Sequence, residues 1–241
     1  MNRFFLTALL FLRFASISSS QFVDDFSDGD FTQNPTWQGD MANFAVNASA
    51  ELQLNAPAAG MSFLAVQGNI PDSAIWNLRF RLEFAPSNNN LLRIYLLADQ
   101  LDLTMANGYF LEIGETGSLD ALRLFRQDAG AKTLIATGQP GLVATNPTDI
   151  RLRAKRTTSD IWELEAVAGN GVLEPQFTVI DAAYGGAANR FFGFQCTYTT
   201  LNVAKFFFDD ISILPDAPDT QPPVLISANR SEEHTSELQS H

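Results

Sequence analysis

The sequence is poor in the residues on which much hydrolytic and metal chemistry depends. It contains 1 cysteine and 2 histidines among 241 residues. The single thiol, Cys196, excludes an intrachain disulfide and any site built from several cysteines. Both histidines, His234 and His241, lie at the far C-terminal end. The rest of the chain therefore lacks the imidazole that Ser-His-Asp catalysis, Cys-His catalysis and histidine-ligated transition metals require.

Positive charge is also scarce. The chain has 15 lysine and arginine residues against 27 aspartate and glutamate residues, which gives a net charge of −12. Nucleic acids and other polyanions are bound through broad basic surfaces, so we expect no nucleic-acid partner. This negative net charge is compatible with cations or neutral molecules as ligands.

Long hydrophobic runs are absent, and the longest lies at the N-terminus. Residues 1–20 combine Arg3, the apolar stretch 4–12 and the small residues Ser18 and Ser20, a pattern typical of a secretory signal peptide. The apolar stretch is too short to span a bilayer and is interrupted by Arg13. A buried N-terminal helix is the alternative. We expect an exported chain with no membrane insertion after signal removal.

The C-terminal end changes in character after residue 214. Residues 215–223 are rich in proline and polar residues, which predicts a stiff linker. Residues 224–229 resemble the first strand of a truncated next module. Residues 230–241 have no hydrophobic periodicity and read like the in-frame translation of a sequencing adapter, so we interpret them as an artefact. A genuine polar tail is the alternative.

Between these ends the pattern is that of β-strands. In residues 76–84, five apolar side chains alternate with four polar ones, as in a strand with one wet face. The same period recurs in 150–155, 109–113 and 162–166. Shorter or more continuously apolar runs predict further strands at 44–46, 51–55, 62–66, 91–98, 121–126, 132–136, 191–198 and 205–214. Turn signals separate the runs, and no segment keeps a helical period. We predict an all-β, two-sheet antiparallel jelly-roll sandwich over residues 21–214.

Four blocks of sequence carry a resemblance to a known family. They are Asp24–Asp40, Leu52–Gly60, Phe125–Asp128 and Lys205–Ile211. Together they resemble the N-terminal concanavalin-A-like (laminin-G-like) domain of secreted bacterial lamin-tail-domain-containing surface proteins. The resemblance implies a jelly roll, export from a Gram-negative cell, and a secreted or cell-surface location. In the wider laminin-G-like superfamily it implies carbohydrate binding as the commonest role, with calcium often structural.

Clustered aspartates are the candidate metal ligands. The first and last strands of a jelly roll commonly pair, which would bring Asp24 and Asp25 near Asp209 and Asp210. Four carboxylates at close range would repel one another unless a cation intervened, so a structural calcium ion is one hypothesis. The alternative is aspartates that bond backbone amides at turns and strand ends.

Exposed aromatic side chains could stack on the apolar C–H faces of sugar rings. Trp37, in a polar turn, and Tyr184, beside Gly185 and Gly186, are the candidate ligand-binding residues. Core packing is the alternative for both. We also expect core packing for the remaining candidates, which are Trp76, Tyr95, Tyr109 and Tyr198.

Two further charged motifs invite a functional interpretation. Glu163 and Glu165 are spaced like catalytic acids of some glycosidases on this fold, but the Glu-x-Asp-x-x-Glu arrangement of those enzymes is missing. We expect a solvated strand face with Trp162 and Leu164 in the core. The one basic strip is likewise expected to be a solvated face, with contact to an acidic polysaccharide as the alternative. It comprises Arg151, Arg153, Lys155 and Arg156.

These observations favour a non-enzymatic, exported binding or adhesion module of a multidomain surface protein, with a carbohydrate or surface glycan as its partner. Two alternatives remain open. One is a structural spacer that presents downstream lamin-tail or immunoglobulin-like modules. The other is a glycoside hydrolase or lyase on the same fold.

Overall fold

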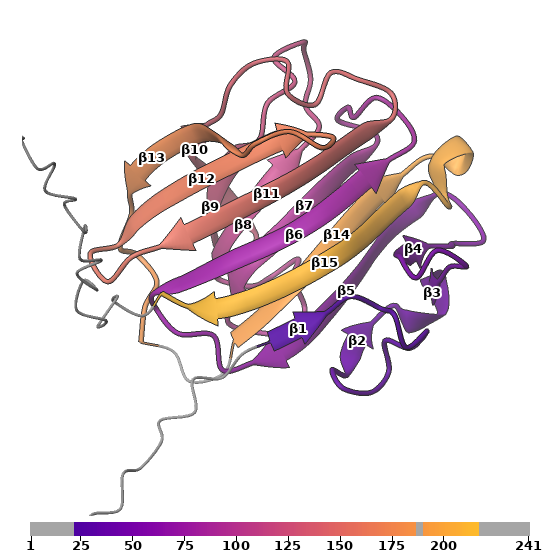
Figure 1. The fold of residues 1–241 in the computed structure, drawn as a ribbon, viewed down its shortest axis with the longest axis horizontal. Coiled ribbons are helices and arrows are strands. Elements are labelled where there is room, and N and C mark those ends of the chain that lie inside the picture. The colour runs from indigo at the N-terminus through magenta and orange to yellow at the C-terminus, as the bar shows by residue number, and fades with distance from the viewer. Residues whose placement is uncertain (1–21, 187–189, 217–241) are drawn as a thin grey trace, which may run out of the picture.

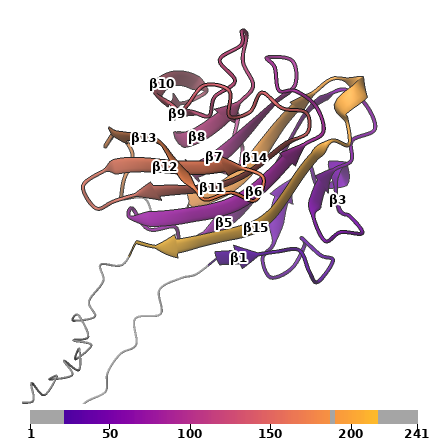
Figure 2. The same ribbon diagram turned by 45° about the horizontal axis from the view of Figure 1, so that its top comes forward.

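The computed structural model describes residues 22–186 and 190–216, which form two antiparallel β-sheets packed face to face (Figure 1). The two sheets are seen as separate layers in Figure 2. Within the described residues the remaining regular elements are two short 3-10 turns, Met41–Asn43 and Thr200–Asn202. The expected signal peptide, the start of a next module and the adapter-like segment lie outside the described residues.

One sheet, sheet A, faces the viewer in Figure 1. Its strand order is β13-β12-β11-β6-β15-β4-β3, and β1 also pairs with β15. The strands are β1 (Phe22–Asp24), β3 (Phe44–Val46), β4 (Leu52–Leu54), β6 (Ala74–Leu82), β11 (Thr148–Arg156), β12 (Ile161–Ala168), β13 (Glu174–Ile180) and β15 (Phe206–Pro215).

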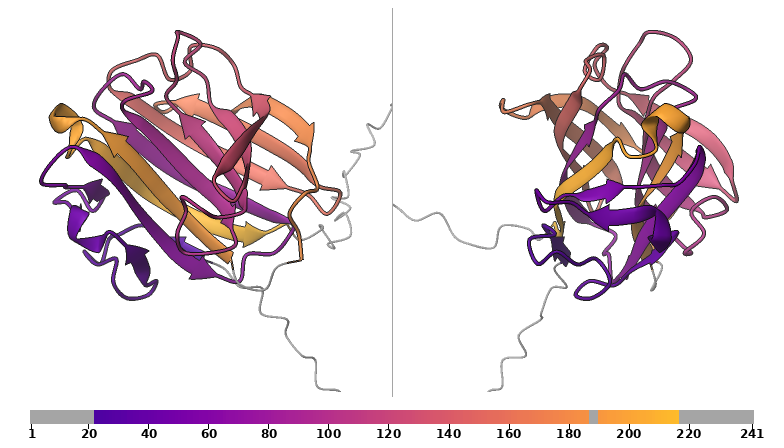
Figure 3. Two further views of the ribbon diagram at one scale, coloured as in Figure 1. Left: turned by 180° about the vertical axis from the view of Figure 1, so that it is seen from behind. Right: turned by 90° about the vertical axis from the view of Figure 1, so that its right-hand side faces the viewer.

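The second sheet, sheet B, is seen from behind in the left view of Figure 3. Its order is β10-β9-β8-β7-β14-β5-β2. The strands are β2 (Trp37–Gly39), β5 (Gly60–Gly68), β7 (Leu91–Ala98), β8 (Gly108–Ile113), β9 (Arg123–Asp128), β10 (Ala131–Thr137) and β14 (Arg190–Tyr198).

This architecture confirms the predicted all-β jelly-roll sandwich. The alternating segment around residues 76–84 forms β6, whose burial alternates residue by residue. Segments 44–46 and 91–98 form β3 and β7 with the predicted bounds. The predicted pairing of first and last strands also occurs, since Asp24 of β1 lies opposite Ile211 of β15. Pro215, expected to open the linker, is instead the last residue of β15, where it pairs with Ala74.

The core between the sheets is built from aromatic rings as well as aliphatic side chains. Phe194 of β14 stacks on Phe208 of sheet A, with ring centroids 3.8 Å apart, and on Trp37 of β2 at 5.6 Å. None of these three side chains is exposed to solvent. The contact between Phe194 and Phe208 therefore joins the centres of the two sheets.

A second apolar cluster lies on the outer face of sheet B. Tyr95, Phe110 and Phe125 point away from the core, and the loop between β7 and β8 covers them with Leu103 and Ala106. The aromatic rings contact one another, with Phe110 stacked on Phe125 at 5.4 Å. Because both faces of β8 are covered, all six of its residues are buried.

Antiparallel pairing gathers alternate loops at the same end of the sandwich. The connections β5–β6, β7–β8, β9–β10, β11–β12 and β13–β14 lie at one end, which we call the ligand end for the reasons given below. The other connections between long strands, including β14–β15 with Leu201, lie at the opposite end. Loops far apart in the sequence therefore become neighbours.

Replacing Phe194 by alanine should reduce the free energy of unfolding by about 3–5 kcal/mol, because the cavity would remove contacts with both sheets. Urea denaturation of the purified domain measures this. Leu201→Ala is the control, since that side chain is 81% exposed and its loss should change stability by less than about 0.5 kcal/mol. Equal losses for the two variants would contradict the role given to Phe194.

Candidate ligand-binding hollow beside Tyr184

Tyr184 differs from every other tyrosine and tryptophan in this protein. The chain has 3 tryptophans and 4 tyrosines, and all of them except Tyr184 are buried. The buried ones are Trp37, Trp76, Trp162, Tyr95, Tyr109 and Tyr198. Tyr184 is partly exposed on the connection between β13 and β14. It is therefore the one tyrosine or tryptophan ring that can offer part of its surface to a ligand.

Tyr184 lines a hollow of about 140 Å³ at the ligand end. Side chains and backbone from the β7–β8 loop, the β13–β14 connection and the adjoining strand ends form its walls. The lining residues are Leu97, Ala98, Asp99, Asn107, Gly108, Tyr184, Gly185 and Arg190. We refer to it as the Tyr184 hollow.

The wall formed by the β7–β8 loop is held by a carboxylate–amide pair. Asp99 accepts hydrogen bonds from the backbone N–H of Asn107 at 2.8 Å and from its Nδ2 at 2.7 Å. Oδ1 of Asn107 in turn accepts from the backbone N–H of Ala129 at 2.8 Å. Gly108 has φ +150°, and a Cβ there would lie 1.9 Å from the carbonyl oxygen of Leu97. Only glycine fits, so no side chain projects from this position beside the hollow.

The opposite wall is tied to the rest of the domain by two arginines. Arg190 is 4% exposed and donates to the carbonyl of Ile70 at 3.0 Å and to the carboxylate of Asp72. The Asp72 carboxylate also accepts the backbone N–H of Gly186 at 2.9 Å. Arg156, 1% exposed, donates to the backbone carbonyl of Tyr184. These bonds fix the backbone on both sides of the tyrosine.

The Tyr184 ring is fixed as well. Its edge meets the ring of Tyr109 at a centroid distance of 5.9 Å, and its hydroxyl donates to Asp128. Partial burial and the bond to the Asp128 carboxylate raise the pKa of Tyr184 to about 12. At neutral pH the phenol is therefore protonated and remains a hydrogen-bond donor.

This arrangement can recognise a polyhydroxylated ring. An aromatic face packs against apolar C–H groups, while carboxylate and amide groups bond hydroxyls in fixed directions. Asp99 uses only part of the hydrogen-bonding capacity of its carboxylate in the bonds to Asn107, so it can accept further hydroxyl donors. A hollow with an apolar wall and a few fixed polar groups is the usual form of a small-molecule site.

Sequence reasoning identified Tyr184 but missed Asp72, Asp99 and Arg190. The three come from separate loops or strand ends, so no local motif joins them. Asn107 immediately precedes β8, and Gly108 is the first residue of that strand. The signal that could have helped is topological, because alternate loops of an antiparallel sandwich share one end.

Trp37, a candidate for an exposed ligand-binding side chain, is instead buried in the structure. Its side chain is fully buried against Phe194, and its Nε1 donates to Oδ2 of Asp24 at 2.8 Å. The short strand β2 pairs with β5 and turns the ring into the core. The neighbouring polar residues suggested a surface turn, but the period of this strand places the tryptophan inward.

The four aspartates proposed for calcium are not brought together as a site. Asp24 faces the core and accepts from Trp37, whereas Asp25 accepts from the backbone and hydroxyl of Ser27. Asp209 and Asp210 lie on β15, where Oδ1 of Asp209 accepts the backbone N–H of Asp210 at 2.8 Å. Within residues 22–186 and 190–216 no three His, Cys, Asp or Glu side chains gather as metal ligands. These carboxylates therefore do not fit the calcium hypothesis, and those of Asp24, Asp25 and Asp209 bond backbone amides.

Burial rather than a metal dominates the environment of Asp24. It is 8% exposed, and this burial raises the pKa of its carboxyl despite the bonds from Trp37 and Phe26 that favour the charged form. Burial also raises the pKa of Asp209.

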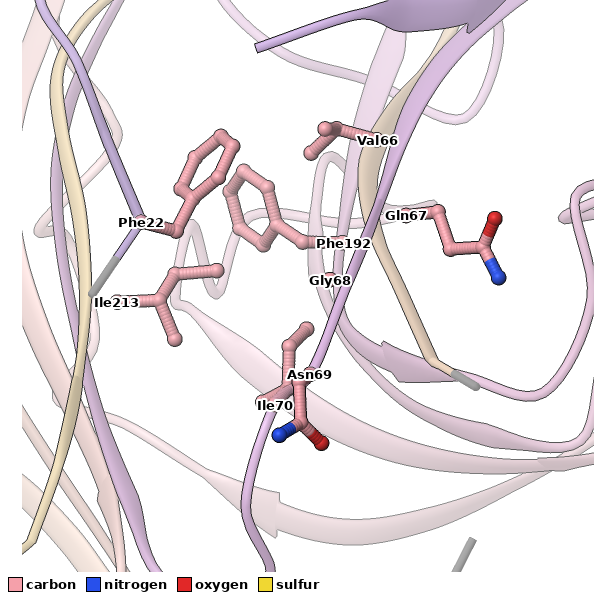
Figure 4. Close-up of a pocket in the computed structure, with 8 residues that line it drawn as sticks. All are labelled: Phe22, Val66, Gln67, Gly68, Asn69, Ile70, Phe192 and Ile213. Carbon is pink, nitrogen blue, oxygen red and sulfur yellow. The ribbon is translucent and has the colours of Figure 1, made fainter. Parts of the chain in front are cut away.

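Two other hollows have different chemistry. The one in Figure 4 lies between the sheets beside β1, has a volume of about 130 Å³, and is lined mainly by apolar side chains such as Phe22, Phe192 and Ile213. Polar side-chain groups there come only from Gln67 and Asn69. It suits a small apolar group better than a sugar.

The second hollow, of about 430 Å³, lies on the outer face of sheet A and includes Glu163 and Glu165. As predicted, the neighbouring side chains Trp162 and Leu164, which alternate with these glutamates in β12, are buried. Arg153 of the basic strip pairs with Glu165, and Lys155 pairs with Asp216 at 3.2 Å. Glu163, Glu165, Arg153 and Lys155 thus form the expected solvated face. Arg156, also expected on this face, is instead buried and pairs with Asp160.

Comparison with known proteins supports the fold. No protein-family model matches the chain, and no curated protein gives a significant match. Among solved structures, the lumenal domain of VIP36 bound to Ca²⁺ and Man3GlcNAc superposes with a TM-score of 0.59 at 7% identity, covering 84% of this chain and 90% of that one. The legume lectin-like domain from Entamoeba histolytica gives 0.56 at 12% identity, covering 80% and 97%.

A bacterial carbohydrate-binding module is similar as well. The module CBM66 from Bacillus subtilis gives a TM-score of 0.51 at 13% identity, covering 74% of this chain and 94% of that one. These values establish a lectin-like, concanavalin-A-like jelly roll as the fold. Across the described residues, no helix has the length and apolar character required to cross a membrane.

Replacing Asp24 by alanine should lower the free energy of unfolding by about 1–3 kcal/mol, because the indole N–H of Trp37 would remain buried without its acceptor. Asp25→Ala removes a neighbouring carboxylate that is exposed, and its effect should be clearly smaller. Urea titration, monitored by tryptophan fluorescence, measures the free energy of unfolding of both variants. If the two variants lost equal stability, the bond between Asp24 and Trp37 would not have the role assigned to it.

Proposed function

We propose that this domain is a non-enzymatic carbohydrate-binding module that holds a neutral sugar unit in the Tyr184 hollow. The observation that carries the proposal is the partial exposure of the Tyr184 ring at a hollow with carboxylate and amide walls, while every other tyrosine and tryptophan is buried. The ring would stack on the sugar, and Asp99 would accept hydrogen bonds from its hydroxyls.

The structural neighbours support the same class of ligand. Their names describe a carbohydrate-binding module, a carbohydrate recognition domain and a mannose-bound lumenal domain. The wider context is also part of the proposal. The leader-like residues 1–20 and the resemblance to lamin-tail-domain-containing surface proteins support an exported protein, secreted or displayed by a Gram-negative cell, in which this domain serves adhesion or glycan capture.

A spacer is the second candidate function, and it predicts no ligand at all. The ordered hollow at the ligand end favours binding, because a spacer has no need for a partly exposed ring between fixed polar groups. The hydrolase alternative has less support. Glu163 and Glu165 lie on an open strand face, where Glu165 is engaged by Arg153.

Tyr184→Ala should weaken glycan binding about five- to tenfold, since stacking of the aromatic ring on the sugar contributes about 1–1.5 kcal/mol. Tyr184→Phe keeps the ring and should retain most of the affinity. A glycan array of neutral and acidic oligosaccharides identifies the ligand, and calorimetry then measures both variants.

Leu201→Ala, at the opposite end of the sandwich, is the matched control for an exposed apolar side chain. It should bind like the unaltered protein. If the unaltered domain binds no glycan on the array, the spacer function is favoured. If Tyr184→Ala binds glycan as tightly as the unaltered domain, the Tyr184 hollow is not the binding site.

A further inference from the structure

Glu112 of β8 is a buried carboxylate on the outer face of sheet B that is surrounded by three cations. It is 2% exposed. Its oxygens accept hydrogen bonds from Nε of Arg93 at 2.9 Å, from Nη2 of Arg123 at 3.0 Å and from Nζ of Lys132 at 2.7 and 2.9 Å. We refer to these four residues as the Glu112 cluster.

The Glu112 cluster carries more positive than negative charge. Besides Glu112, the only carboxylate in ion-pair contact with its cations, within the described part of the chain, is Glu115, which lies 3.3 Å from Arg123. Three cations therefore face two carboxylates. This local excess contrasts with the net charge of −12 for the whole chain. One cation would have been enough to neutralise a buried glutamate, so the additional charge needs another explanation.

Two of the cations retain access to solvent. The side chain of Lys132 is 40% exposed and that of Arg93 is 23% exposed. Arg93 uses Nε for Glu112 and Nη1 for Gln195, which leaves Nη2 without a hydrogen bond inside the described residues. A guanidinium N–H and an ammonium group held side by side can both donate charge-assisted hydrogen bonds to a carboxylate.

The cations are also held in position before any ligand arrives. Arg93 lies over the ring of Phe110 at 5.0 Å, and Lys132 lies over the ring of Phe125 at 4.7 Å. Those two rings stack on each other. A site whose side chains are already ordered loses less conformational entropy on binding. Cation–π contacts of this kind place the charges without neutralising them.

The cluster is connected to the Tyr184 hollow by the β7–β8 loop. Asp99 and Asn107 of this loop line the hollow. The same loop is tied to sheet B by Gln127, whose Nε2 donates to the carbonyls of Leu103 and Ala106 at 2.8 and 2.9 Å. Oε1 of Gln127 accepts a hydrogen bond from the hydroxyl of Tyr95. The same hydroxyl is within hydrogen-bond distance of Oε1 of Gln195, which also accepts from Arg93. A continuous polar path thus runs across the face of sheet B.

We propose that the Glu112 cluster is a second binding subsite that takes the carboxylate group of an acidic saccharide, such as a uronic acid unit. Arg93 and Lys132 donate to the ligand carboxylate, while Glu112 stays buried and orients them. The choice of a saccharide rests on the proposed function of the Tyr184 hollow, whereas the choice of an anion rests on the charge excess alone. The excess positive charge disfavours a metal ion at this place.

The test compares two probes of the same size and shape, a tetramer of galacturonic acid and its fully methyl-esterified form. Calorimetry on the full chain should give at least about fivefold tighter binding of the acid, because charge-assisted bonds exceed neutral ones. Lys132→Met and Arg93→Met should each remove most of this preference and leave binding of the ester unchanged. Two arginines still hold Glu112 in Lys132→Met, so that variant should fold.

Lys155→Met, on the outer face of sheet A, is the matched control and should keep the preference. Equal binding of acid and ester by the unaltered chain would overturn the subsite, and so would a preference that survives in both variants. Failure of both tetramers to bind would overturn the uronic acid assignment, whereas the neutral-sugar proposal for the Tyr184 hollow is tested separately by the glycan array. Inorganic sulfate is the third probe. If sulfate binds the unaltered chain, binds Lys132→Met more weakly, and neither tetramer binds, the saccharide assignment is overturned. The cluster would then be a site for a simple anion only.

Discussion

The structure depends on the aromatic contact that joins its two sheets. Phe194 occupies the centre of sheet B and stacks on Phe208 of sheet A, and Trp37 closes the same stack from the edge strand β2. A two-layer β-structure without disulfides must obtain its stability from packing between the layers. The buried Asp24 extends this packing, because it satisfies the one polar atom of Trp37.

The rigid sandwich then determines where chemistry can occur. Alternate loops meet at one end, and two buried arginines hold part of the backbone there. Arg156 and Arg190 anchor the backbone around Tyr184 and Asp72. The outer face of sheet B offers a second environment, in which aromatic rings support a group of cations. One fold thereby presents a hollow suited to neutral hydroxyls and a flat surface suited to a negative charge.

Much of the fold could be predicted from the sequence, because period-2 alternation reports one-sided burial directly. This worked for β6 and β12, where polar and apolar residues alternate. It did not reveal β1, β2 or β13. The first two have three residues each, and β13 is an edge strand that contains Pro175 and is largely exposed.

The candidate site was harder to predict from the sequence than the fold, for a different physical reason. A turn rich in polar residues favoured an exposed Trp37, but exposure depends on which face of a short strand points inward, and three residues do not define that. Asp24 at the end of β1 lies opposite Ile211, next to Asp209 and Asp210 in the middle of β15, so the backbone positions are neighbours as expected. Their side chains diverge because successive residues in a strand point to opposite faces. Tyr184 was found because glycines follow it, while its partners required the three-dimensional fold.

The chain of rings beneath Tyr184 has an optical consequence. Tyr184 touches Tyr109, Tyr109 packs on Trp162 at 4.6 Å, and Trp162 stacks on Trp76 at 5.7 Å. Indole emission responds to small changes in nearby dipoles and charges, and Arg156 lies over the ring of Trp162. The protein therefore contains a built-in pair of fluorophores next to Tyr184, whose emission would change if a ligand bound there, without any attached dye.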